Sequence, residues 1–473
     1  MNKKLFLIKM FKKISSNFFK SVQQNYITIL IFLLFFVYAT TIFYKDVQFL
    51  PNMSIPSTES RLNSYFTNDF FTSVYFRANQ MIKGQEMNVL ALYPEYVDSA
   101  SGQLFPLLFS PLLYLKGSGR FVLYSVFLFF AAIIFILFYV LLMKKSGKEI
   151  FNGGLIFIFA FLISEPGFIG IYMGNTDIVL APVMGMLILL VINSNKNELN
   201  SLTRTILLGI LAGALMNAKI FLFPFAVLAV IYSKRSFLTG LVSFLTFMAL
   251  IYAPNLFGSQ SSLASYFSKV ISWDSYIPFS THLWGNHSLY AIASFFSGCI
   301  DSAKCSNQVV NISIVILLFL FTFLVPFLIS RPFKKNFFKG IGYSAFLKLR
   351  KNKSFIIVLL VISVAFINLA FRVVYDYRLF YSLVISLILL KESTKLKNAS
   401  TYCYLSMFSL LLGGIWALKL NPNEPWTIDA RLIKFFIIFH FFFLILSSIY
   451  FWKESGVKST GKFNEIKRRN KHE

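Results

Sequence analysis

Charged side chains are scarce in this chain of 473 residues: Asp, Glu, Lys and Arg make up 14% of it, whereas hydrophobic residues make up 57%. A soluble globular protein carries about a quarter charged residues. The apolar residues form long runs, such as Tyr26 to Tyr44 and Phe121 to Met143. About 20 apolar residues cross a bilayer core of roughly 30 Å as a helix. The composition therefore excludes a soluble globular protein and predicts one that crosses a membrane several times.

The alternation of apolar and polar residues that marks a membrane β-barrel is missing from these runs. In a helix the backbone satisfies its own hydrogen bonds inside the membrane, where no water is available. The 58 phenylalanines suit helix faces that contact lipid or other helices. We therefore predict an all-α polytopic membrane protein, a bundle of about 12 transmembrane helices.

Metal-binding and nucleotide-binding motifs are missing as well. The chain has 3 cysteines and 4 histidines, and none of their spacings resembles a zinc site. The cytoplasmic parts contain no glycine-rich nucleotide-binding loop. We expect no cofactor, and nothing implies a divalent metal. Cys299 and Cys305 fall in a segment that we assign to the outer side, where a disulfide can persist, so the bridged and the free forms both remain open.

Acidic residues are fewer than basic ones, 19 against 45, which gives a net charge of +26. Such a charge can indicate a nucleic-acid partner. Here most basic residues lie in short clusters between the apolar runs, on one side of the predicted membrane, which is the positive-inside pattern. Lysines precede the first run, and no signal-peptide cleavage site follows it. We predict a cell (inner) membrane protein with both termini in the cytoplasm and with membrane lipids, not nucleic acid, as partners.

The apolar runs define the predicted crossings of one membrane domain, 1–473. Between them lie a first outer loop at 45–120 with surface helices, a second outer loop at 254–309, a basic cytoplasmic loop at 330–353 and a basic cytoplasmic tail at 453–473. Because the larger loops are external, we expect the chemistry to be external too. The crossings lie near residues 26–44, 121–143, 150–168, 178–193, 205–217, 220–232, 238–253, 310–329, 354–373, 380–390, 400–418 and 433–452.

The apolar run from Thr205 to Tyr232 would make a single helix of about 42 Å, which is long for one crossing. A single crossing would also place the basic loop at 330–353 outside, against the charge pattern. Two short helices that enter and return keep that loop inside. We therefore predict a helix break at Asn217 to Lys219, in a region that lines a cavity and is shielded by neighbouring protein.

An amphipathic helix is predicted in the first outer loop, directly after Asn68 and Asp69. Either of these residues can cap the helix. Asp69 can also serve as a general base, because its carboxylate would be held at the membrane surface. The two roles are compatible. The apolar residues that recur on one face of this helix are Phe70, Val74, Ala78, Met81 and Ile82.

A series of short motifs runs along the chain from Asp69 to Leu390. They are Asp69-Phe70 with Tyr75, Ala78, Gly84 and Tyr93; Phe105-Pro106 and Pro111; Gly174-Asn175; Gly209 to Gly213 followed by Lys219; Asn286-His287-Ser288-Leu289; and Tyr375-Asp376-Tyr377. In their order and topology these motifs resemble glycosyltransferase family 87, polyprenyl-phosphate-mannose-dependent enzymes of the membrane-embedded GT-C type. The chain departs from the family at Gly174-Asn175, which is shortened and lacks Gln, and at His287, where the family has Gln.

The resemblance implies that Asp69 is the catalytic base. In such enzymes an aspartate of the outer loop deprotonates the acceptor hydroxyl, which attacks the sugar carbon that carries the lipid phosphate and inverts the anomeric centre. Asp46 is the rival, because other GT-C families place their acid directly after the first span. We favour Asp69, since the residues after it match the family and those after Asp46 do not.

The donor that this resemblance implies is a phosphodiester anion, which needs cations at the membrane. Lys219, Arg372 and Arg378 are the candidate ligands of the phosphate, together with His287. Arginine suits a phosphate because its guanidinium makes two-point contacts. Lys219 can instead extend to the interface as a snorkelling lysine, and the two arginines can pair with Asp376.

Aromatic and polar residues cluster in the second outer loop and again late in the chain. Tryptophan at a membrane interface commonly belongs to an aromatic belt. It can also form a platform for a sugar, with hydrogen-bonding side chains beside it. The predicted substrate-binding residues are Tyr75, His282, Trp284, Asn286, Asp376 and Tyr377.

The resemblance thus implies an inverting membrane hexosyltransferase that acts in cell-envelope glycan biosynthesis. It would move a sugar, by resemblance mannose, from a polyprenyl-phosphate donor to a glycan or glycolipid acceptor outside the cytoplasm. A lipid-linked sugar transporter or flippase is one alternative. It predicts internal repeats and charges spread along the helices, and the sequence shows neither. An O-antigen-type polymerase or ligase, which takes a diphosphate lipid, is the other alternative.

Overall fold

The computed structural model describes residues 70, 74–84, 103–113, 120–144, 146–164, 166–167, 170–171, 174–193, 201–268, 288–297, 308–329, 353–370, 378–417 and 428–469. Every regular element in these ranges is helical, and none of them contains a β-strand. The prediction of an all-α protein is therefore confirmed for this part of the chain. The predicted first crossing, at 26–44, lies outside the described residues.

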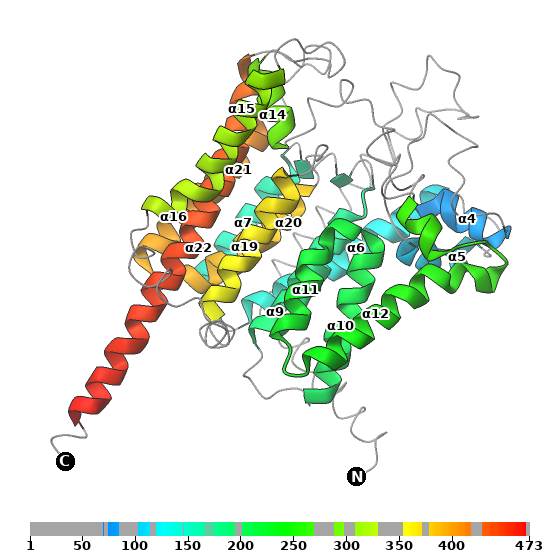
Figure 1. Cartoon of the computed structure of the whole chain (residues 1–473), viewed down its shortest axis with the longest axis horizontal. Coiled ribbons are helices and arrows are strands. Elements are labelled where there is room, and N and C mark those ends of the chain that lie inside the picture. The colour runs from blue at the N-terminus through cyan, green and yellow to red at the C-terminus, as the bar shows by residue number, and fades with distance from the viewer. Residues whose placement is uncertain are drawn as a thin grey trace.

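Figure 1 shows the order of the helices along the chain. Three of the elements are not α-helical: η4 (Ile220–Leu222) and η5 (Ala253–Phe257) are 3-10 turns, and η7 (Leu320–Leu324) is a π-helical segment. The α-helices are α4 (Phe76–Ile82), α5 (Leu104–Leu113), α6 (Arg120–Met143), α7 (Lys148–Leu162), α9 (Asp177–Ile192), α10 (Ser201–Ala218), α11 (Phe223–Tyr232), α12 (Ser236–Tyr252), α14 (Leu289–Ser297), α15 (Gln308–Phe319), α16 (Val325–Ile329), α19 (Lys353–Leu369), α20 (Leu379–Ser393), α21 (Lys397–Ala417) and α22 (Ile428–Arg469).

Several of these helices are suited to a membrane. Four are long and apolar enough to cross one: Val122–Met143, Ser236–Phe257, Val309–Ile329 and Lys434–Ser455. Shorter apolar helices accompany them, at Leu104–Leu113, Asp177–Ile192, Leu202–Ala218, Ile220–Tyr232 and Lys353–Leu369. Each predicted crossing from 121–143 onward overlaps a described helix. The total of about 12 crossings stays a prediction.

Helix α7 is shorter than the predicted crossing at 150–168. It ends at Leu162, where Ile163 and Ser164 turn the chain. The Ser164 hydroxyl donates a hydrogen bond to the carbonyl of Phe161 at 2.6 Å and so satisfies one of the last helical acceptors. Pro166 follows two residues later, and proline cannot donate the backbone hydrogen bond that a continuing helix needs.

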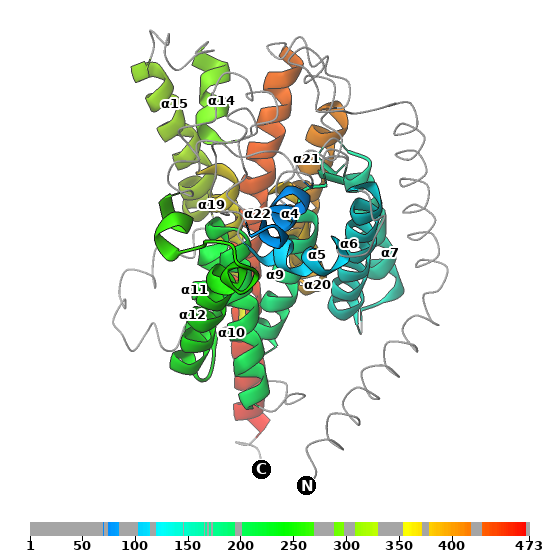
Figure 2. The same cartoon turned by 90° about the vertical axis from the view of Figure 1, so that its right-hand side faces the viewer.

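Helices α9 and α20 form the centre of the bundle, and nearly every residue of both is buried. Helices α6, α10 and α11 pack on α9, while α7, α19 and α21 pack on α20 (Figures 1 and 2). Both central helices are apolar on all sides, as expected for helices that neighbours surround. The contact between α9 and α20 therefore lies at the centre of a core to which most of the other helices contribute, and the first residues of both helices lie where polar side chains meet.

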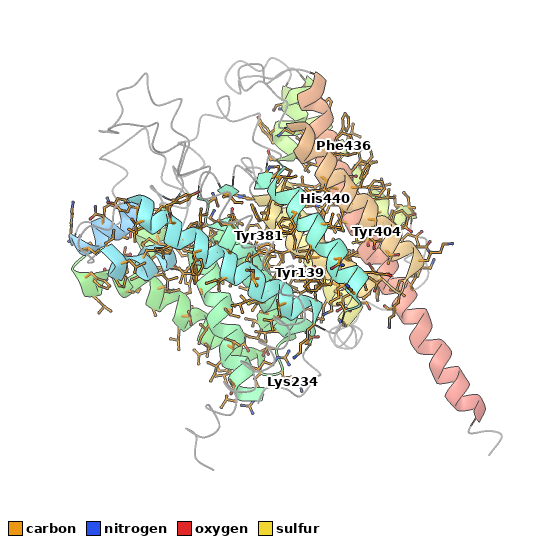
Figure 3. The ribbon with its side chains drawn as sticks, turned by 180° about the vertical axis from the view of Figure 1, so that it is seen from behind. Tyr139, Lys234, Tyr381, Tyr404, Phe436 and His440 are labelled. Carbon is orange, nitrogen blue, oxygen red and sulfur yellow. The ribbon has the colours of Figure 1, made fainter. Side chains whose placement is uncertain are left out.

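The two ends of the bundle differ. The last turns of α22 extend beyond the other helices at one end, and Lys234, between α11 and α12, lies at the same end (Figures 1 and 3). Both segments are predicted to be cytoplasmic. Helices α4 and α14, from the two predicted outer loops, lie away from that end (Figure 1). Which side of the membrane each of these segments occupies stays a prediction.

The helix is interrupted between α10 and η4, as predicted from the sequence. Helix α10 ends at Ala218, and Lys219 has an extended backbone with φ −149° and ψ 115°. Helix α10 then packs closely against α12, since a Cβ atom on Gly213 would lie only 2.3 Å from the carbonyl oxygen of Ser243. The glycine thus permits an approach of two backbones that a larger residue would prevent.

The predicted amphipathic helix after Asp69 is present, but it is more deeply embedded than its pattern indicates. Phe70, Val74, Ala78 and Met81 are all buried, as predicted. Arg77 is buried as well, with 1% of its surface exposed, because α4 packs against α5 and η5. Gln80 of the same helix is buried too, whereas Lys83 directly after the helix is exposed. The position of the helix at the membrane surface stays a prediction.

Candidate functional site

The turn that begins α9 is set by Gly174 and Asn175. Gly174 has a φ of +65°, and a Cβ atom there would lie 2.7 Å from the Cβ atom of Phe70 and 2.7 Å from the ring of Tyr124. Only glycine meets both conditions without strain. The Asn175 side-chain oxygen then accepts the backbone N–H of Asp177 at 2.9 Å, as in an Asx turn. This local geometry presents Asn175 and Asp177 together at the helix start.

Lys219 forms an ion pair with Asp177. The distance from Lys219 Nζ to Asp177 Oδ1 is 3.0 Å, and the two side chains are 8% and 0% exposed. The same ammonium donates to the Asn175 side-chain oxygen at 3.3 Å. The extended backbone between α10 and η4 is what brings this lysine to the start of α9. A buried charge that is paired in this way is far less costly than an isolated one.

Tyr381, in the first turn of α20, completes the contact between the helices. Its hydroxyl donates to Asp177 Oδ1 at 2.6 Å, and its ring is fully buried in the middle of the molecule (Figure 3). Asp177 Oδ2 is buried and accepts no hydrogen bond from the part of the chain that the structure describes. Side chains from two separate segments, the α10–η4 break and α20, therefore converge on a single carboxylate at the start of α9.

A second cation lies beside this ion pair. The guanidinium carbon of Arg378 is 4.0 Å from the centre of the Phe221 ring, and Lys219 Nζ is 5.8 Å from the same centre. The Tyr381 ring meets Phe221 edge-on, with 6.0 Å between ring centres. Cations are attracted to the face of an aromatic ring. We refer to Asn175, Asp177, Lys219, Phe221, Arg378 and Tyr381 as the polar cluster.

Segments from both predicted outer loops dock beside the polar cluster, on the last turn of α10. The Asn217 side-chain oxygen accepts the backbone N–H groups of Gln103 at 3.0 Å and Leu104 at 3.1 Å, which caps the start of α5. The Tyr266 hydroxyl lies 3.3 Å from the carbonyl oxygens of Met216 and Asn217. The helix break, the loops and the polar cluster therefore share one region of the molecule.

Tyr266 also interacts with Arg77 of α4. Burial lowers the pKa of Arg77 to about 9, and the interaction with Tyr266 opposes that change. Burial raises the pKa of Tyr266, and Arg77 opposes that change in turn. At neutral pH Arg77 remains charged, so a third cation is present in this region. The apolar pattern of α4 does not predict that Arg77 is buried, because the pattern describes only the spacing of the apolar residues.

Two of the predicted phosphate ligands, Lys219 and Arg378, are brought together at the Phe221 ring. Tyr75 is half-buried at the start of α4. The roles of these residues as ligands stay predictions. The predicted residues that lie outside the described part of the chain are Asp69, its rival Asp46, Arg372, His287, His282, Trp284, Asn286, Asp376 and Tyr377, together with Cys299 and Cys305.

Sequence reasoning missed Asp177 and Tyr381. A signal for Asp177 exists: it is an acidic residue directly before the apolar run 178–193, where a charge is costly unless it is paired. Tyr381 has a weaker signal, since it lies one helical turn after Arg378. In the described ranges, no group of three or more His, Cys, Asp or Glu side chains is placed to hold a metal ion.

The sequence and the structure were compared with protein families, curated proteins and solved structures. No curated protein and no solved structure matches it significantly. The model of glycosyltransferase family 87 matches residues 103–346, which is more than half of the chain. The matched range includes Asn175, Asp177 and Lys219. Asp69 and Arg378 are not in it. The chain belongs to glycosyltransferase family 87.

Proposed function

We propose that the protein is an inverting glycosyltransferase whose donor is a polyprenyl-phosphate sugar. The sugar is mannose, the acceptor is a glycan or glycolipid, and transfer takes place on the outer side of the membrane. Membership of the family supports glycosyl transfer itself. The observation that carries the choice of donor is the convergence of Lys219 and Arg378 on the Phe221 ring.

Two cations in an apolar bundle suit a lipid phosphate. Lys219 and Arg378 are each 6% exposed, and they come from different segments of the chain. Holding charges among apolar helices is costly, so such residues are usually functional. An anionic phosphate beside both cations would interact favourably with each of them, and the Arg378 guanidinium can contact two of its oxygens. In the proposal these side chains also stabilise the charge on the departing phosphate.

An apolar groove between α11 and α12 suits the isoprenoid chain of such a donor. Its volume is about 360 Å³, and Met216, which lines it, is three residues from Lys219. Helices α10, α11 and α12 pack together around it (Figure 1). A lipid with its phosphate at Lys219 would then place its chain among these helices. The groove is lined by Met216, Ala226, Val227, Val230, Ile231, Gly240, Ser243, Phe244, Phe247, Met248, Leu263 and Phe267.

Asp69 remains the proposed base. It directly precedes Phe70, whose Cβ atom lies close to the Gly174 position before the polar cluster. Asp177 is a poorer choice, because its carboxylate is already bound by Lys219 and Tyr381. In the proposed reaction the Asp69 carboxylate takes the proton of the acceptor hydroxyl. The hydroxyl oxygen forms a bond to the anomeric carbon, the bond from that carbon to the phosphate oxygen breaks, and polyprenyl phosphate leaves with the electron pair.

The remaining predicted residues have supporting roles in this proposal. Arg372 and His287 assist at the phosphate. The sugar and the acceptor are bound by Tyr75, His282, Trp284, Asn286, Asp376 and Tyr377.

The proposal is tested by transfer assays on purified protein with polyprenyl-phosphate mannose and with a diphosphate-linked sugar lipid. We expect transfer from the monophosphate donor. In Lys219→Met and Arg378→Met we expect at least a tenfold loss of kcat/KM for the donor, since each variant removes one cation from the phosphate. Lys353→Met, which removes a half-exposed cation in α19, is the control and should retain activity.

Transfer from the diphosphate donor alone would instead identify a polymerase or ligase. Movement of the lipid-linked sugar across vesicles without a new glycosidic bond would identify a transporter. Either result contradicts the proposed function.

A further inference from the structure

Asp177 has no role in the reaction proposed above, although Lys219 and Tyr381 of the polar cluster both bind its carboxylate. Its side chain is fully buried, with Lys219 Nζ at 3.0 Å and the Tyr381 hydroxyl at 2.6 Å, both at Oδ1. Its other oxygen, Oδ2, accepts no hydrogen bond from any described residue. The carboxylate is therefore held by one oxygen only, and that oxygen faces the lysine.

The backbone also favours this arrangement. Asp177 begins α9, so its carboxylate lies at the positive end of the helix dipole, and its own N–H is bound by Asn175. Asn175 in turn accepts a hydrogen bond from Lys219 Nζ at 3.3 Å. Two acceptors at the start of α9 thus fix two of the three ammonium hydrogens of Lys219.

We propose that Asp177 is a positioning residue of the donor-phosphate site: with Tyr381 and Asn175 it holds the Lys219 ammonium beside Phe221 and Arg378, ready for the lipid phosphate. This inference rests on the proposed function, because it takes Lys219 as a phosphate ligand. Lysine is flexible, and fixing it before the donor arrives lowers the entropy lost on binding. Asp177 itself touches neither the sugar nor the acceptor in this scheme.

A purely structural role is the competing explanation. A buried ion pair can simply join α9, the α10–η4 break and α20, and such pairs often stabilise a protein no more than an apolar replacement would. The two explanations differ in what they predict for the substrates. Loss of a positioning residue weakens binding of the donor alone, because the residue acts through Lys219. Loss of a structural ion pair lowers stability and weakens binding of the donor and of the acceptor alike.

The test is a double-mutant cycle on Asp177→Asn and Lys219→Met, with KM measured separately for polyprenyl-phosphate mannose and for the acceptor. Asp177→Asn keeps the side-chain shape and removes the charge. We expect it to raise the donor KM about tenfold and to leave the acceptor KM unchanged. In the Lys219→Met background we expect Asp177→Asn to have no further effect on the donor KM, because Asp177 acts through Lys219.

Two further variants complete the design. Tyr381→Phe removes one hydroxyl from the cluster, so we expect a smaller rise in the donor KM, about twofold to fivefold. If Asp177→Asn does not fold, this variant and the neutral pair Asp177→Asn/Lys219→Met carry the test. Glu392→Gln is the control: it breaks the ion pair between Lys353 and Glu392, 2.8 Å apart, near the other end of α20 and should leave the donor KM unchanged.

The inference is overturned if Asp177→Asn lowers thermal stability but leaves the donor KM as in the unmodified protein. It is equally overturned if the effects of the two substitutions on the donor KM simply add. A protein that transfers no sugar from a polyprenyl-phosphate donor would refute the proposed function, before any variant is made. The two failures are therefore distinguishable.

Discussion

Lys219 is itself the one residue with an extended backbone between two helical elements, α10 and η4. Had α10 continued through it, the side chain would follow the helix surface; instead the break directs it to Asp177, 3.0 Å away. Both features of Lys219 that matter, its charge and the nearby break, are visible in the sequence. The contacts among Lys219, Asp177 and Tyr381 are not visible there, because the residues are far apart in the sequence, Asp177 and Tyr381 by 204 positions, and meet only in the folded bundle.

Gly174 is the residue on which the start of α9 depends. An alanine there would bring a Cβ atom to 2.7 Å from Phe70 and from Tyr124, at a φ of +65° that alanine rarely adopts. We expect Gly174→Ala to destabilise the protein by about 1–3 kcal/mol, as overpacked sites do. A thermal melt of the purified protein measures this.

The matched control is Gly153→Ala in α7, where no atom lies within 4 Å of the new methyl group. Alanine favours helix more than glycine does, so this variant should be at least as stable as the unmodified protein. Equal melting temperatures for the two variants would show that the turn at Gly174 is not under the constraint described.

At the scale of elements, the α11–α12 pair is the part of the fold that we propose to hold the lipid chain of the donor. The two helices are joined by a short turn and leave an apolar groove of about 360 Å³ between them. The charge pattern and the length of the run 205–232 predict that α11 is separate from α10, since a single crossing would invert the sides of all that follows, and α12 corresponds to the predicted crossing at 238–253. The groove itself is a result of side-chain packing, and no periodicity in the sequence reveals it.

Filling the groove should weaken binding of long-chain donors. Gly240 lines it, and the nearest neighbour of a Cβ atom there is Val230 Cγ1 at 3.5 Å, so a larger side chain must extend into the open space. We expect Gly240→Phe to raise the KM for a long polyprenyl-phosphate donor several-fold. A donor with a very short isoprenoid chain should be unaffected, since it does not reach the filled part.

Gly153→Phe, at an exposed position of α7 with no neighbour within 4 Å, is the control for this substitution. It should leave the KM values for the long and for the short donor unchanged. An equal rise in KM for the long and the short donor in Gly240→Phe would argue against a chain in the groove. It would indicate a general disturbance of the helices instead.

For the whole molecule, the sequence predicts the class of fold because the bilayer restricts the possibilities: long apolar runs must be helices, and basic clusters assign their sides. The helices from α6 onward follow those runs closely. The site is predicted less well. Lys219 and Arg378 are found from their charge, whereas the burial of Arg77 and the role of Asp177 depend on which helices pack together, as α4 does with α5 and η5.

The central claim is that Lys219 and Arg378 receive the phosphate of a lipid-linked sugar. It is tested most directly by an experimental structure of the membrane-embedded protein with a non-hydrolysable polyprenyl-phosphate mannose analogue. We predict phosphate density within about 3 Å of both Lys219 Nζ and the Arg378 guanidinium, with the sugar directed toward Asp69. Phosphate density away from both cations, or Asp69 on the opposite side of the membrane from it, would contradict the account.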